Sequence, residues 1–67
     1  MEITINSRPR QIDACLTLSD VMRDEGLYDK GGVAVAVNGR VVRRAQWNTC
    51  MLADGADIII INAAYGG

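Results

Sequence analysis

The sequence predicts an α+β fold, in which one α-helix packs across one face of a mixed sheet of four to five strands. Three observations lead to this prediction. Polar and apolar residues alternate near the start of the chain, as in a strand with one buried face. A capping motif at Thr17 precedes an apolar stripe with helical spacing, and Asn38-Gly39 separates two β-branched runs, as in a hairpin.

Length and composition limit the function. The 67 residues, 49% hydrophobic and 22% charged, make one globular domain, which is too small to wall a deep enzyme cleft. The net charge of −1 predicts no nucleic-acid partner and no anionic membrane surface as partner. The absence of His argues against an imidazole-based triad and a zinc site, and Cys15 and Cys50 are expected to be reduced core residues. The chain opens with Met1-Glu2, where a signal peptide would be basic, and its longest apolar run, residues 58–61, is far too short to span a membrane. Both observations predict a cytoplasmic protein.

The first half of the chain is expected to form a hairpin and the helix. Ile3 and Ile5 belong to the first strand, residues 6–9 have turn chemistry, and alternation over residues 11–16 predicts the second strand. Thr17 and Asp20 fit a capping box, with Leu18, Val21 and Met22 as the stripe that faces the sheet. Gly26 suits the position just after the helix, which gives a helix of about nine residues.

The second half is expected to complete the sheet. Residues 33–37 form a strand, Asn38-Gly39 turns the chain, and Val41 and Val42 form a short return strand. Residues 43–47 lack a period of two, so we expect one helical turn that tucks Trp47 under the sheet. Residues 58–61 are apolar on both faces, which favours a central strand beside the first one. This arrangement is the β-grasp or ubiquitin-like fold.

The chain is predicted to divide into a folded body, residues 1–62, and a flexible tail, residues 63–67, that ends in Tyr65-Gly66-Gly67. Two glycines without Cβ atoms make the thinnest polypeptide, which can thread a narrow channel, and an extended tail of this length spans about 17 Å. A nucleotide-using enzyme could activate the α-carboxylate of Gly67 as an acyl-adenylate, which a sulfur or nitrogen nucleophile could then attack. The alternative is an accidental Gly-Gly on a plain interaction module.

The whole chain resembles the ThiS family of sulfur carriers. The resemblance rests on the opening residues 1–6, on Thr17 and its helix, on the Val-Asn-x-x-Val-Val-x-Arg-x-x-Trp stretch ending at Trp47, on Asp54-Gly55, and on Gly66-Gly67. It implies a protein that catalyses nothing and binds no cofactor. An E1-like, ThiF-like adenylyltransferase would consume ATP to adenylate Gly67, and a cysteine-desulfurase relay would supply sulfur. The thiocarboxylate would then donate its sulfur to a ThiG-like thiazole synthase.

Other residues and functions stay open. One of the two isoleucine pairs of residues 58–61 lies away from the helix; Ile59 and Ile61 either form an apolar docking surface or are buried under the Trp47 segment. Arg43 and Arg44 either pair with acids of a partner or form a solvated face, which is the more usual role. The rival functions are a carrier for molybdopterin or tRNA thiolation, a ubiquitin-like modifier, and a plain interaction module.

Overall fold

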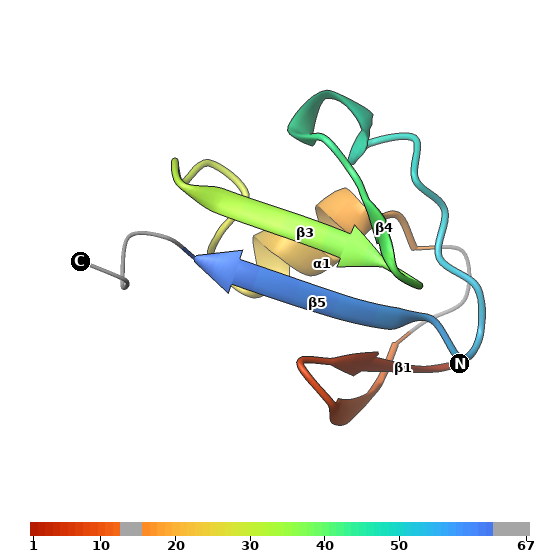
Figure 1. Cartoon of the computed structure of the whole chain (residues 1–67). Coiled ribbons are helices and arrows are strands. Elements are labelled where there is room, and N and C mark those ends of the chain that lie inside the picture. Colours follow the sequence, from red (N-terminus) through yellow and green to blue (C-terminus); the bar gives the residue numbers. More distant parts are fainter. Residues whose placement is uncertain (13–15, 63–67) are drawn as a thin grey trace.

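A computed structural model describes residues 1–12 and 16–62 and confirms the α+β, ubiquitin-like fold, with a five-stranded mixed sheet (Figure 1). The strand order is β2-β1-β5-β3-β4. The strand β5 is parallel to β1 and antiparallel to β3, so the most apolar strand is central, as the sequence predicts. The elements are β1 (Glu2–Ile5), β2 (Arg8–Gln11), α1 (Leu18–Asp24), β3 (Val33–Val37), β4 (Arg40–Val41), the 3-10 helix η1 (Arg44–Gln46) and β5 (Asp57–Asn62).

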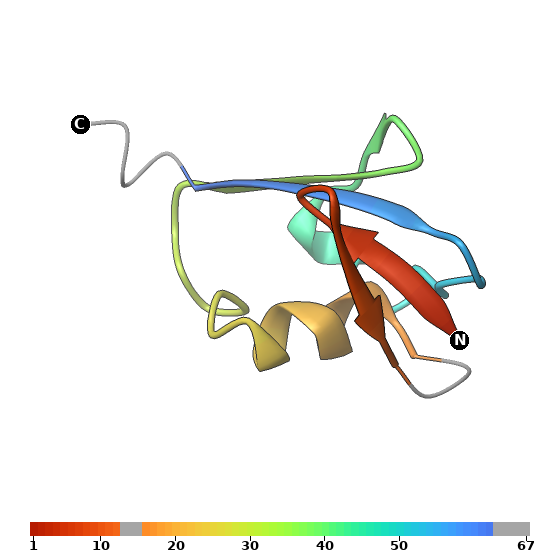
Figure 2. The same ribbon diagram turned by 90° about the horizontal axis from the view of Figure 1, so that it is seen from below.

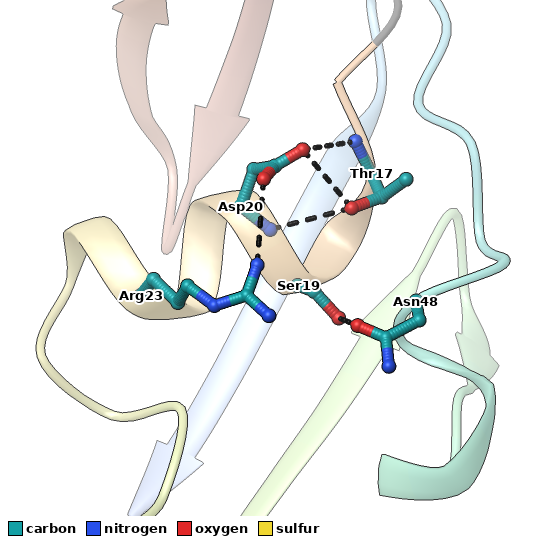
Figure 3. A network of polar contacts seen from close by, with 5 residues as sticks. All are labelled: Thr17, Ser19, Asp20, Arg23 and Asn48. Carbon is teal, nitrogen blue, oxygen red and sulfur yellow. Dashed lines mark hydrogen bonds and ion pairs between the residues drawn. The ribbon is translucent and has the colours of Figure 1, made fainter.

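The capping box at the start of α1 is confirmed (Figure 3). The Asp20 carboxylate accepts from the Thr17 backbone N–H at 3.0 Å, and the Thr17 hydroxyl accepts from the Asp20 N–H at 3.4 Å. These hydrogen bonds from Thr17 lower the pKa of Asp20, and the Arg23 guanidinium 3.6 Å away lowers this pKa further. The Ser19 hydroxyl donates to Asn48 and joins the helix to the segment after η1.

The helix has seven residues, fewer than the expected nine or so. Gly26, with φ of 75°, ends it in the left-handed conformation that favours glycine. The Gly26 N–H donates to the Arg23 carbonyl at 3.0 Å, and the Leu27 N–H donates to the Met22 carbonyl at 2.9 Å. The positive φ of Gly26 stops the helix, and these two bonds satisfy carbonyls of the last turn that the helix leaves without a partner.

The position predicted for the second strand is wrong. The chain turns already at Asn6 and Ser7, both with positive φ, and β2 begins at Arg8, so Arg8 and Pro9, which the sequence pattern assigned to the turn, lie in the strand. Pro9 lies within β2, opposite Thr4, which is compatible with an edge strand that needs hydrogen bonds on one side only. Of residues 11–16, Gln11 ends β2, and residues 13–15, with Cys15, lie outside the described residues.

The β3–β4 hairpin and the turn of helix after it are confirmed. Asn38 and Gly39 have φ of 52° and 83°, as a two-residue hairpin turn requires, although β4 begins one residue earlier than expected. Trp47, directly after η1, is 1% exposed, and its indole N–H donates to the Val42 carbonyl at 3.0 Å. The only indole therefore fills the core with its polar atom satisfied.

The core lies on one side of the sheet, where α1 and η1 both pack (Figure 2). Within the described part of the chain, no helix has the length and apolarity to cross a membrane. The core consists of Ile3, Ile5, Leu18, Val21, Met22, Val35, Trp47, Leu52, Ala56 and Ile58.

Candidate functional site

The predicted site residues of the tail, Tyr65, Gly66 and Gly67, lie outside the described residues, so the structure shows the root from which the tail departs. That root is Asn62, the last residue of β5, which pairs with Val33 of β3. The strand β5, which Asn62 ends, is the middle strand of the sheet and lies beside β3 (Figure 1). At this end β5 is paired with β3, through Asn62 and Val33, whereas its ladder with β1 stops at Ile58.

The side chains of β5 alternate between the core and the open face of the sheet. Ile58 is fully buried and Ile60 half-buried, whereas Ile59 is 37% and Ile61 is 61% exposed. The alternative that Ile59 and Ile61 are buried under the Trp47 segment is wrong, because Trp47 packs with Ile58 on the helix side. Strand alternation leaves the odd-numbered pair on the opposite face.

These two isoleucines join an apolar strip across three strands. The register places Ile61 opposite Ala34, Ile59 opposite Ala36, and Ala36 opposite Val41, which is 77% exposed. Residues directly opposite one another share a face, so the strip is continuous. We name it the sheet-face patch: Ala34, Ala36, Val41, Ile59 and Ile61.

Arg43 and Arg44 have different environments. The Arg44 guanidinium donates to the carbonyls of Tyr28 and Lys30 and lies 4.6 Å from the centre of the Trp47 ring. Arg44 therefore fastens the loop after α1 to η1. Arg43 is exposed at the N-terminal cap of η1, and its charge is available to a partner.

Sequence reasoning treated Asn6 and Asn38 as turn residues only, and it missed what their side chains do. The Asn6 Oδ1 accepts from the Ile60 N–H at 2.8 Å, and the Asn38 Oδ1 accepts from the Asp57 N–H at 2.9 Å. The two amides thus hold β5 near its end and at its start. The signal in the sequence is that Asn, unlike Gly, brings a hydrogen-bonding side chain to a position with positive φ.

No metal centre is evident in residues 1–12 and 16–62, where no group of three or more His, Cys, Asp or Glu is placed to hold an ion. Asp54 and Asp57 have structural partners instead. The Glu2 N–H donates to Asp54, and the Thr4 hydroxyl donates to Asp57, each at 2.8 Å. Cys50 is a free, half-buried thiol.

The sequence model of the ThiS family matches residues 3–67. No curated protein sequence matches the chain. A crystal structure of the thiamine biosynthesis protein ThiS from Geobacter metallireducens superposes with a TM-score of 0.80 at 22% identity, over 91% of each chain. An NMR solution structure of a thiamine biosynthesis protein from the same organism has a TM-score of 0.74 at 22% identity, over 91% of this chain and 81% of that one. At this identity, the two structures support the fold.

Proposed function

Because the chain belongs to the ThiS family, we propose that it is a sulfur carrier for the thiazole moiety in thiamine biosynthesis. The observation that carries the proposal is the family match, which extends through Gly66 and Gly67. The fold is consistent with it, since the central strand β5 ends at Asn62, directly before the tail. The protein is then a substrate of its partner enzymes and catalyses no step itself.

The proposed chemistry takes place at the α-carboxylate of Gly67. In an E1-like, ThiF-like adenylyltransferase, a carboxylate oxygen attacks the α-phosphorus of ATP, and pyrophosphate leaves. The outer sulfur of a persulfide on a cysteine-desulfurase relay then attacks the acyl carbon, and AMP leaves. A thiol reductant cleaves the S–S bond of the resulting acyl disulfide, and the relay cysteine leaves as a thiol in a disulfide with the reductant. The product is a thiocarboxylate, whose sulfur is the nucleophile that a ThiG-like thiazole synthase uses.

The tail is suited to presenting that carboxylate inside an enzyme. Residues 63–67 span about 17 Å when extended, so Gly67 can reach a buried site while the body stays outside. Gly66 lacks a Cβ and lets the tail pass a narrow channel, whereas Tyr65 requires a wider section of that channel. Tethering also gives the thiocarboxylate a high local concentration in the synthase site.

We propose that the sheet-face patch is the surface on which the activating enzyme and the synthase dock. Ile61 and Val41 expose most of their surface, and the patch adjoins the root of the tail through Ile61 and Asn62. A partner that covers the patch therefore receives the tail at the same time. Arg43 supplies a charge at the exposed start of η1, whereas Arg44 is engaged within the chain.

Intact mass spectrometry tests the proposal. The chain is incubated with ATP, a ThiF-like enzyme, a cysteine desulfurase with cysteine, and a thiol reductant, and a gain equal to replacing one oxygen by sulfur is expected. A Gly67-deleted chain is the control and should gain no mass. If the full chain also gains none while its fold is intact by circular dichroism, the carrier function is refuted. Adding a ThiG-like synthase with its substrates should then return the thiocarboxylate to the carboxylate.

A further inference from the structure

The hydrogen bonds of Asn6 single it out near the root of the tail. The strand β1 ends at Ile5, and its ladder with β5 pairs Ile5 with Ile58. The Asn6 N–H still donates to the Ile58 carbonyl at 2.8 Å, but the chain then turns back through Ser7 into β2. Within the described part of the chain, the ladder between β1 and β5 therefore extends no further than Ile58.

The Asn6 side chain takes the place of the missing backbone. Its Oδ1 accepts from the Ile60 N–H at 2.8 Å, and its Nδ2 donates to the Ile60 carbonyl at 3.3 Å. One amide thus satisfies both polar groups of Ile60, as a paired strand residue would. Ile60 is two residues before Asn62, where the tail starts.

On these grounds we propose that Asn6 is a positioning residue for the tail, because its side chain holds the end of β5 in the sheet and thereby fixes where the tail departs. The inference rests on the proposed carrier function. A docked body presents the tail carboxylate to the enzyme at an effective concentration that depends on how well the tail's origin is defined. If β5 frays on the β1 side, the point at which the tail starts varies more in position. A smaller fraction of docked molecules then has the tail carboxylate in the active site.

Asn38 provides a matched control. It also lies at a positive φ in a hairpin turn, and its Oδ1 also accepts a backbone N–H of β5. That N–H belongs to Asp57, the first residue of β5, five residues or about 16 Å along the strand from Asn62. Asn38→Gly therefore removes a comparable bond at the end of β5 opposite the tail.

The test compares Asn6→Gly with Asn38→Gly in the full chain. Glycine keeps the positive φ of each turn and removes only the side chain. Loss of the Asn6 bonds should speed amide hydrogen exchange at Ile60 by about fivefold to tenfold and lower kcat/KM for thiocarboxylate formation by about fivefold. Asn38→Gly should leave kcat/KM within about twofold of the wild-type value, even if its melting temperature falls as much as that of Asn6→Gly.

Two results would overturn the inference. One is equal kcat/KM for the two variants at a temperature where both are folded, because no difference is expected if Asn6 contributes to stability alone. The other is unchanged exchange at Ile60 in Asn6→Gly, which needs no partner enzyme. If the wild-type chain itself gains no sulfur, the proposed function fails and the positioning role fails with it. If the wild-type chain gains sulfur and kcat/KM is lower for Asn6→Gly than for Asn38→Gly, both are supported.

Discussion

Replacing Ile61 with Ala tests the proposed docking surface most directly. Full burial of a large aliphatic side chain contributes about 2.5 kcal/mol. Ile61 keeps 61% of its surface exposed, so docking has about 1.5 kcal/mol left to gain from it. Since 1.4 kcal/mol corresponds to about tenfold, Ile61→Ala should lower kcat/KM with a ThiF-like enzyme by about that factor. For Ile59, which is 37% exposed, the same reasoning gives about 0.9 kcal/mol, or about fivefold.

The assay is the initial rate of pyrophosphate release at several carrier concentrations below KM. Met51→Ala is the matched control, because Met51 is 58% exposed but lies beside Thr17, away from the open face of the sheet. Circular dichroism melts check folding, since the part of Ile61 already buried contributes about 1 kcal/mol, or about 4–8 °C in Tm. Equal kcat/KM for Ile61→Ala and Met51→Ala would refute the docking role of the patch.

Three further predictions concern stability. Ser7 has φ of 70° in the first turn, so Ser7→Gly should raise the free energy of unfolding by about 0.5–1 kcal/mol in urea titrations, and a loss would contradict the strain argument. Arg44→Ala should cost about 1–2 kcal/mol because two carbonyls and the indole lose a partner, whereas Arg43→Ala should change stability by less than about 0.5 kcal/mol; similar losses would refute the fastening role of Arg44. The lowered pKa of Asp20 implies stability that is present above the ordinary carboxyl range and lost as the pH falls through the folded-state value. Tm of the wild type should therefore fall more steeply than that of Asp20→Asn below about pH 4, and parallel curves would count against the capping box as the cause.

Features set by local chemistry could be predicted from the sequence. The Thr17–Asp20 capping box and the Asn38-Gly39 turn each depend on a few adjacent residues with strong conformational preferences, and both are found as expected. The central position of β5 was also predictable, because a strand that is apolar on both faces is poorly suited to an edge.

Features that depend on distant partners could not be predicted in this way. The strand β2 has the sequence RPRQ and no apolar alternation, because it lies at the sheet edge and its pairing comes from the turn at Asn6 and Ser7. Arg44 is indistinguishable from Arg43 in the sequence until the fold brings the carbonyls of Tyr28 and Lys30 to it. The amides of Asn6 and Asn38 likewise acquire their second role only when β5 lies between the two hairpins.

The register of β5 connects the core, the proposed docking surface and the root of the tail. Ile58 lies in the core and Ile61 on the open face, and a slip of one residue would exchange these faces along the whole strand. A run of four isoleucines barely opposes such a slip by side-chain type, since the same residue would occupy either face. Register must therefore be set largely outside the run. The ladder with β3 carries it, and the N–H groups of Asp57 and Ile60 add to that ladder by donating to the Oδ1 atoms of Asn38 and Asn6. The two hairpin asparagines thus act at different places on β5: Asn38 at its start, and Asn6 two residues before Asn62, where the tail begins.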